Sequence, residues 1–333
     1  MSEQIELLIG CDFGAPLAAG AQAKKPIVIE ASRTGDRRYV ITATGRNERL
    51  VRKSGPHGWT IPDLARSIRE DHPRLTVAAF DFPFSIPLEL LQSAAFACKV
   101  GEDAFGTRAN WARFVEQHVG LEFASDKAGA KVRLDPVIHG WKDKGFWKKR
   151  ATDVATNAQP ALKHVGQVLF NMTVVGSKFL SLLRDGDMQI LLRPEERGQR
   201  LGSLVIETFP RAVARAVGFE DSYKQKPERC LQTAEAYLVE QRIALDFDRD
   251  VRKFCLDYRT SGNDPDGADA FLCLIAAICF REGLAEWRMG DATEEKLDEE
   301  GCIVTPVKLL SSDAEQARSP LSPGKTYAKP LVR

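Results

Sequence analysis

Residues 75–81, LTVAAFD, indicate the fold class, because six uncharged and mostly apolar residues end on the carboxylate of Asp81. A nearly continuous apolar run of this length predicts a strand that is covered on both faces, as strands of parallel sheets are. Pro83 then restricts the residue before it to an extended backbone and marks the end of the strand. The stretch therefore predicts an α/β protein.

Two further apolar runs end in the same way. Residues 5–11 (IELLIGC) stop at Asp12, and residues 201–206 (LGSLVI) stop at Glu207. Sites in open α/β sheets form at the carboxyl ends of strands. We therefore expect these two carboxylates to meet that of Asp81 at one edge of the sheet.

An almost wholly apolar helix begins with two acids. Asp266 and Asp269 open the run DGADAFLCLIAAICF, and their spacing of three places them on one face of the helix. The helix dipole favours negative charge in the first turn, which is a structural explanation for Asp266. Asp269 has the weakest structural explanation, because a buried unpaired aspartate is rare. It is the strongest single candidate for a site residue.

Each acid at a strand end also has a structural explanation. Asp12 is a suitable turn residue, Asp81 could form an Asx-turn before Pro83, and Glu207 could pair with Arg211. If the acids converge instead, two charges about 4 Å apart repel by roughly 4 kcal/mol at an effective dielectric of 20. A divalent cation is then the simplest explanation. Oxygen donors without a Cys/His set favour Mg²⁺ or Mn²⁺ over Zn²⁺.

The order of the remaining elements predicts a mixed sheet. Strands are expected at residues 26–31 and 38–44, joined by a tight hairpin, and a helix at Ile61–Glu70 precedes the strand at residues 75–80. This order is that of an antiparallel meander followed by parallel strands with crossover helices. Further strands are expected at residues 188–192 and 201–208, and helices at residues 160–184, 210–217, 227–243 and 266–287.

We interpret residues 1–310 as a single α/β domain with a largely helical insertion at about residues 82–200. A separate helical subdomain is the alternative. Residues 311–333 are rich in Ser, Pro and Lys and predict a loose C-terminal tail.

Composition limits the class of protein. The 333 residues are 44% apolar and 28% charged, an ordinary globular balance, and the net charge of +1 means that any basic patch is local.

The seven cysteines have no zinc-ligand spacing. Their odd number and the lack of a signal peptide predict a reducing, cytoplasmic location, and no apolar run is long enough to cross a membrane. Neither a Gly-x-Ser-x-Gly elbow nor a P-loop is present.

Residues 139–150 (HGWKDKGFWKKR) interleave basic and aromatic side chains. Positive charge binds phosphates and aromatic faces stack on bases, so this pattern is a candidate nucleic-acid contact. The alternative is a solvated loop whose tryptophans pack inward. The candidate nucleic-acid-binding residues are Lys142, Lys144, Lys148, Lys149, Arg150 and, from a second small basic cluster, Lys224.

Five motifs together resemble a known family. They are IGCDFG, DFPFSIP, VIETFPRAV followed by SYKQKP, DGADAFLCLIAA, and EGCIVTP, spread over residues 9–306. In this combination the chain resembles the domain-of-unknown-function family of predicted ribonuclease-H-like nucleases. The resemblance implies a ribonuclease-H-like fold, and it places the family's carboxylates on Asp12, Asp81, Glu207, Asp266 and Asp269.

The leading hypothesis is a nuclease with two Mg²⁺ or Mn²⁺ ions held by Asp12, Asp81 and Asp269, with Asp266 or Glu207 completing the set. A second hypothesis is phosphoryl transfer of the actin or sugar-kinase type, because Asp12 and Gly14 form an Asp-x-Gly after the first strand. A third is a non-catalytic nucleic-acid-binding or scaffold protein that uses its carboxylates structurally. Metal binding separates the third hypothesis from the first.

Overall fold

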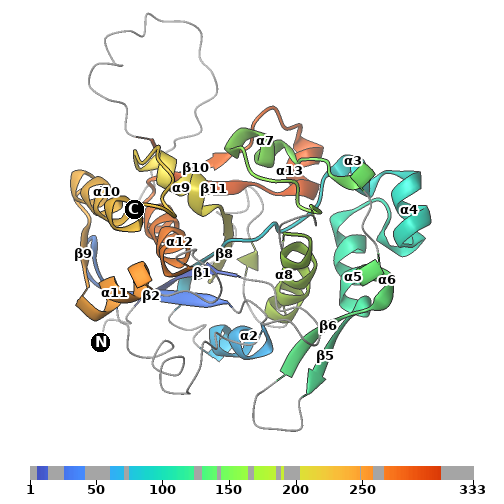
Figure 1. The fold of residues 1–333 in the computed structure, drawn as a ribbon, viewed down its shortest axis with the longest axis horizontal. Coiled ribbons are helices and arrows are strands. Elements are labelled where there is room, and N and C mark those ends of the chain that lie inside the picture. The colour runs from blue at the N-terminus through green and yellow to red at the C-terminus, as the bar shows by residue number, and fades with distance from the viewer. Residues whose placement is uncertain are drawn as a thin grey trace, which may run out of the picture.

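A single mixed sheet forms the centre of the molecule (Figure 1). The computed structural model describes residues 6–13, 26–41, 61–70, 75–123, 130–140, 144–163, 169–184, 189–190, 203–247, 249–257 and 266–308. The strand order is β10-β11-β8-β4-β1-β2-β3-β9, and β7 pairs with β8 outside this path. The strands are β1 (Leu7–Asp12), β2 (Ile27–Gly35), β3 (Arg38–Ile41), β4 (Leu75–Phe80), β7 (Gln189–Ile190), β8 (Leu204–Thr208), β9 (Ala244–Asp246), β10 (Ala285–Arg288) and β11 (Ile303–Pro306).

The pairing confirms the predicted meander and the parallel strands beside it. β2 runs antiparallel to both β1 and β3, whereas β4 is parallel to β1 and β8 is parallel to β4. β11 continues the parallel set, and β10 returns antiparallel to it. The mixed α/β architecture with flanking helices is therefore as expected. Residues 42–44, expected to extend the third strand, lie outside the described residues.

Helices cover both faces of the sheet. On one face lie α9 (Pro210–Ala216), α10 (Pro227–Glu240), α11 (Arg249–Asp257) and α12 (Asp266–Arg281). On the other face lie α2 (Ile61–Glu70) and α8 (Leu169–Arg184). Successive residues of the central strands face opposite sides of the sheet. Leu8 packs in the hydrophobic cluster with α12, and Ile9 packs in the cluster with α2 and α8. This alternation explains why the central strands are apolar throughout.

The described residues between β4 and β8 are largely helical, as predicted, but they also include an unexpected hairpin. Strands β5 and β6 pair antiparallel in a small sheet of their own. Phe96 and Trp111 from this region belong to the same hydrophobic cluster as Phe80 of β4. The elements are α3 (Leu88–Leu91), α4 (Ala94–Val100), η1 (Glu102–Ala104), α5 (Arg108–His118), β5 (Val119–Phe123), β6 (Ala130–Leu134), α6 (Pro136–Gly140), η2 (Lys144–Phe146) and α7 (Ala151–Thr156).

Two predicted helices end earlier than expected, and each is followed by a short strand. α10 stops at Glu240, just before Arg242 takes a left-handed conformation with φ 59°, and β9 follows. α12 stops at Arg281, just before Gly283 takes φ 74°, and β10 follows. The sequence pattern was wrong after α12 because Ala285 and Trp287 belong to β10, and it was wrong after α10 because Ile243 leads directly into β9. α13 (Glu294–Glu300), which leads into β11, was not predicted.

The helix expected at residues 160–184 is α8, which starts later, at Leu169. Residues 160–163 form a turn instead, and residues 164–168 lie outside the described part. Within the residues that the structure describes, no helix is both long and apolar enough to span a membrane.

Candidate metal centre

β1 presents Asp12 on the face of the sheet that carries α12. Side chains alternate along a strand, so Asp12 faces the same way as Gly10. At Gly10 the helix lies directly on the strand, because an added Cβ would come within 2.1 Å of the backbone nitrogen of Leu274. Only glycine permits this approach, which brings the end of β1 next to the first turn of α12. Asp12 is buried there, with 1% of its surface exposed.

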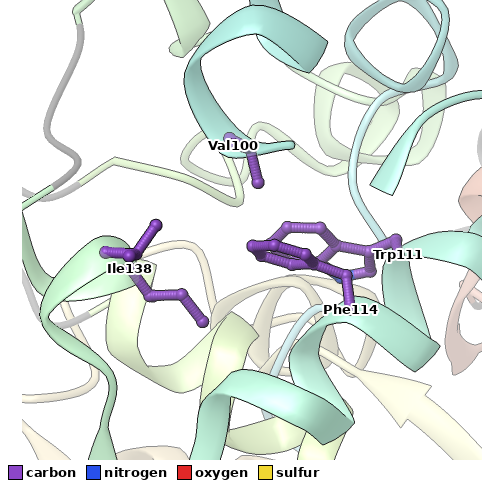
Figure 2. Close-up of a pocket in the computed structure, with 5 residues that line it drawn as sticks. Val100, Trp111, Phe114 and Ile138 are labelled. Carbon is purple, nitrogen blue, oxygen red and sulfur yellow. The ribbon is translucent and has the colours of Figure 1, made fainter. Parts of the chain in front are cut away.

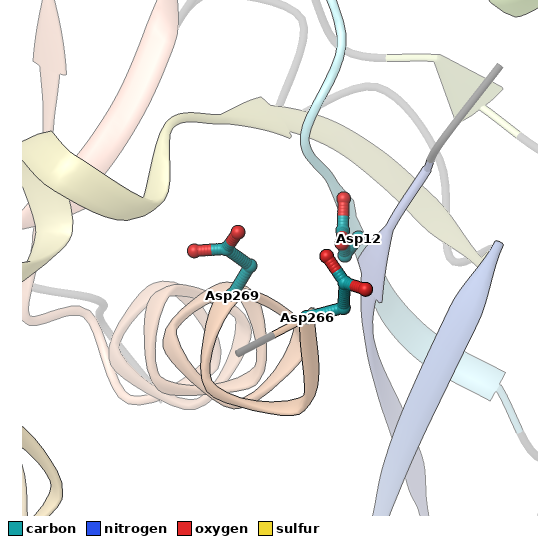
Figure 3. A group of neighbouring side chains, drawn as sticks. All are labelled: Asp12, Asp266 and Asp269. Carbon is teal, nitrogen blue, oxygen red and sulfur yellow. The ribbon is translucent and has the colours of Figure 1, made fainter. Parts of the chain in front are cut away.

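Asp266 and Asp269 lie on the first turn of α12 beside Asp12 (Figure 3). One carboxylate oxygen from each of the three residues lies within 4.8 Å of the others. All three are buried, with exposures of 0% for Asp266 and 3% for Asp269. We call Asp12, Asp266 and Asp269 the aspartate triad. The predicted meeting of a strand end and a helix start therefore holds for these three residues.

The triad concentrates negative charge. Two ionised carboxylates at the 4.8 Å limit repel by about 3 to 4 kcal/mol at an effective dielectric of 20. The positive end of the α12 dipole offsets about 0.3–1 kcal/mol per charge, which is too little to balance three mutual repulsions. The ammonium of Lys224 offsets part of the rest at Asp269, and a bound cation would offset more.

Two side chains from the loop between α9 and α10 contact Asp269. The hydroxyl of Tyr223 donates a hydrogen bond to Asp269 Oδ1 at 2.5 Å, and Lys224 Nζ lies 3.3 Å from Oδ2. Burial raises the pKa of Tyr223 well above its ordinary value, and Asp269, Asp81 and Asp12 raise it further, so the hydroxyl remains a donor at neutral pH. The side chain of Lys224 is 36% exposed and reaches from solvent to the triad.

Asp81 lies beside the triad without belonging to it. Its backbone N–H donates to the carbonyl of Cys11 at 3.0 Å, which continues the β1–β4 pairing by one residue. Burial raises the pKa of Cys273 on α12, and the charge of Asp81 is the next largest cause, so Asp81 faces the α12 side. Among the described residues, the group with ligand atoms all within 4.8 Å contains Asp266 and lacks Asp81. The predicted core set of Asp12, Asp81 and Asp269 thus differs from the observed triad by one residue.

Glu207 lies on the opposite face of the sheet. In the parallel register it aligns with Phe80, and Phe80 aligns with Cys11, so these three side chains share a face. Asp12 is one residue further along β1 and points the other way. The sequence places Glu207 at a strand end, but one residue out of phase with Asp12. The structure thus does not bring it to the triad.

Arg150, proposed from sequence as a nucleic-acid contact, is in fact buried and binds Glu207. Its guanidinium donates to Glu207 Oε1 at 2.5 Å and Oε2 at 2.8 Å, and to Asp153 Oδ1 at 2.7 Å and Oδ2 at 3.1 Å. Burial alone would lower the pKa of Arg150, but the two carboxylates hold it well above its ordinary value. Burial raises the pKa of Glu207 above its ordinary value, and Arg150 opposes this.

The predicted role of Arg150 as a surface contact for nucleic acid is wrong, because its side chain is only 1% exposed. Arg211, the expected partner of Glu207, is exposed.

The other basic candidates divide into three groups. Lys144, Lys148 and Lys149 are exposed, and Lys148 pairs with Glu89 at 3.3 Å. Lys142 lies outside the described residues. Lys224 alone among the described candidates contacts the triad.

Sequence reasoning missed the roles of Tyr223 and of the residues around Arg150. Asp153 lies three residues after Arg150, a spacing that could have indicated the pair. Glu300 is buried at the end of α13, and its carbonyl accepts a hydrogen bond from Arg150 at 3.2 Å. No sequence signal connected Tyr223 to Asp269, because 46 residues separate them.

A small hollow lies elsewhere, among α4, α5 and α6 (Figure 2). It is lined by Val100, Trp111, Phe114, Val137 and Ile138 and has no room for a water molecule. Its lining offers apolar surface only, so it has no group that recognises a phosphate or a metal.

Comparisons with protein-family models, with curated proteins and with solved structures found no match for this chain.

Proposed function

We propose that this protein is a divalent-metal-dependent nuclease that hydrolyses phosphodiester bonds at the aspartate triad. The observation that carries the proposal is the convergence of Asp12, Asp266 and Asp269, with ligand oxygens within 4.8 Å of one another in a buried site. Separate elements supply these residues, and mutual repulsion disfavours their meeting without a counter-ion.

The donor chemistry fits Mg²⁺ or Mn²⁺. Carboxylate oxygens are hard ligands, and magnesium is commonly held by one or two carboxylates plus water and substrate phosphate. When bound at such a site, the ion supplies Lewis-acid chemistry for phosphodiester hydrolysis. Three aspartates suffice for one ion. A second ion needs a further donor, and Asp81 is a candidate on the same face of the sheet.

The sheet topology supports the proposal further. An antiparallel β3-β2-β1 meander followed by parallel β4 and β8 is the order expected of a ribonuclease-H-like fold. The triad lies at the end of the first, central strand of that order. A fold alone does not assign a function, so the weight of the proposal rests on the site.

The protein's own residues have separate tasks at this site. Asp12, Asp266 and Asp269 hold the ion. Tyr223 fixes one oxygen of Asp269 by donating a hydrogen bond to it, as outer partners of metal ligands do. Lys224, whose side chain is partly exposed, offers a positive charge at the rim of the site to an incoming phosphate.

The direct test is cleavage of labelled DNA, RNA and RNA–DNA hybrid substrates with Mn²⁺ or Mg²⁺. We expect cleavage by the wild-type chain, abolished by EDTA and reduced at least about 100-fold in Asp12→Asn and Asp269→Asn. Asp103→Asn, at an exposed position on η1, is the matched control and should cleave like wild type. Equal cleavage by all four proteins would rule out the assignment.

One observation favours a second function, a non-catalytic binder that uses the triad structurally. Asp269 already has a cationic neighbour in Lys224 and a hydrogen-bond donor in Tyr223. Calorimetric titration with Mn²⁺ separates the two functions. Binding that Asp12→Asn removes supports the nuclease, whereas the absence of Mn²⁺ binding to the wild-type chain supports the binder.

A further inference from the structure

We propose that Arg150 is a positioning residue that fixes the backbone after β4, and thereby the place of Asp81 beside the aspartate triad. This inference rests on the proposed function only in treating the triad and Asp81 as a metal centre. The support is a buried set of contacts on the other face of the sheet, made by Arg150, Asp153, Glu207 and Glu300. We call these four residues the Arg150 clamp.

The clamp begins at the start of α7. Arg150 donates to both oxygens of Asp153 and of Glu207 and to the carbonyl oxygen of Glu300, and its backbone N–H donates to Asp153 Oδ2 at 3.0 Å. The carboxylate of Glu300 accepts from the backbone N–H of Ala151 at 2.8 Å. Arg150 therefore joins the start of α7, the end of β8 and the end of α13.

Two carboxylates of the clamp bind the backbone that follows Asp81. Glu207 Oε2 accepts from the N–H of Phe84 at 2.9 Å, and Glu300 Oε1 accepts from the N–H of Leu88 at 2.9 Å. The segment 84–88 is thus held at one end by Glu207, whose carboxylate Arg150 binds, and at the other by Glu300, whose carbonyl oxygen Arg150 binds. Between them the chain is buried.

Asp81 lies between two fixed points. Its own N–H is bound to Cys11 in the sheet, and three residues later Phe84 is bound to Glu207. Phe82, between them, packs on Gly176 of α8, where an added Cβ would come within 2.3 Å of its ring. These three contacts leave the backbone of Asp81 little freedom, so its carboxylate faces α12 from a constant position.

Stability alone is a weak explanation for the clamp. Burying one guanidinium with three carboxylates carries a large desolvation cost, and apolar residues of similar volume often stabilise a fold equally well. The planar fork of arginine gives directional, bidentate hydrogen bonds that apolar packing does not provide. Directional contacts are useful where a backbone must be held in one place.

The test is a double-mutant cycle between Arg150→Lys and Asp81→Asn, read by Mn²⁺ affinity in calorimetry. Lysine keeps the charge of Arg150 but loses the fork. We expect each single variant to bind Mn²⁺ about tenfold more weakly and the double variant to bind no more weakly than either. Arg252→Lys, which alters a part-buried pair with Glu235, is the matched control and should leave the affinity unchanged. If the two losses multiply in the double variant, Arg150 does not act through Asp81 and the inference is wrong.

A second measurement does not depend on metal binding. Hydrogen exchange in the metal-free protein should be at least about tenfold faster at the amides of Phe84 and Leu88 in Arg150→Lys, with the strand amides of β1 unchanged. If Arg150→Lys does not fold, Glu207→Gln replaces it in both measurements with the same expectation. Unchanged exchange at both amides contradicts the inference. Faster exchange in a protein whose wild type binds no Mn²⁺ supports the clamp while rejecting the proposed metal centre.

Discussion

Two groups of carboxylates lie at the same end of the central strands, on opposite faces of the sheet. In the Arg150 clamp, Asp153, Glu207 and Glu300 surround a guanidinium that is 1% exposed. In the aspartate triad, Lys224 contacts Asp269, and the side chain of this lysine is 36% exposed. The clamp encloses its cation, whereas Lys224 is a partly exposed cation at the rim of the triad. This difference separates a structural acid cluster from a candidate binding site.

The largest expected effect tests the structural side of this comparison. Arg150→Met should lower the free energy of unfolding by about 3–5 kcal/mol, because it leaves buried carboxylates without their cation. Chemical denaturation measures the loss. A change below about 1 kcal/mol would mean that the clamp is energetically equivalent to an exposed ion pair.

Removing a charge from the aspartate triad should raise the free energy of unfolding, whereas removing the charge of Arg150 should lower it. In Asp12→Asn we expect the metal-free protein to gain at least about 1 kcal/mol of stability, because two of the three pairwise repulsions in the triad are removed. The same variant should lose at least about 100-fold in Mn²⁺ affinity, which cancels the rise in melting temperature that Mn²⁺ gives the wild type. Thermal denaturation with and without Mn²⁺ tests both signs, and a destabilised metal-free variant would place Asp12 among the structural acids.

The contact at Gly10 should matter for both stability and the site. Gly10→Ala places a methyl group against the backbone of α12 and should cost about 1–3 kcal/mol of stability by overpacking. Because the displaced helix carries Asp266 and Asp269, Mn²⁺ affinity should fall as well. Gly218→Ala tests a glycine with open space around it, although its φ of 98° adds backbone strain of its own. A loss of stability with unchanged Mn²⁺ affinity would show that α12 need not touch β1 for binding.

The smallest effect is expected at Lys224. Lys224→Met should change the free energy of unfolding by less than about 1 kcal/mol, as for other exposed pairs. Mn²⁺ affinity should rise, because a competing cation at Asp269 is lost. Calorimetry checks this, and a fall in affinity would mean that the lysine supports the ion rather than competing with it.

Local patterns were sufficient to predict the strands and the paired acids of α12. Leu75–Phe80 and Ile61–Glu70 appear with the expected bounds, and the spacing of Asp266 and Asp269 correctly placed them on one face. Proximity across the sheet was not predictable in the same way. Glu207 follows an apolar run as Asp12 does, but the register between strands turns it to the other face.

Arg150 shows a second reason why sequence reasoning fails. It follows Lys148 and Lys149, so local composition suggested a solvated basic run. Its environment is instead set by Glu207, 57 residues away, and by Glu300, 150 residues away. The hydroxyl of Tyr223 likewise binds Asp269, which lies 46 residues further along the chain. Contacts between residues so far apart in the sequence produce no local pattern from which they could be predicted.

The glycine contact between β1 and α12 has a consequence for ion size. With no side chain between strand and helix, the gap that separates Asp12 from Asp266 and Asp269 is set by two backbones in contact. Backbones pressed together adjust less than side chains that change rotamer. Such a rigid gap suits a small ion with ligands at about 2.0–2.1 Å better than Ca²⁺, whose ligands lie at about 2.3–2.6 Å in flexible cages. Gly10, which has no ligand atom of its own, would then help to determine which cation the site binds.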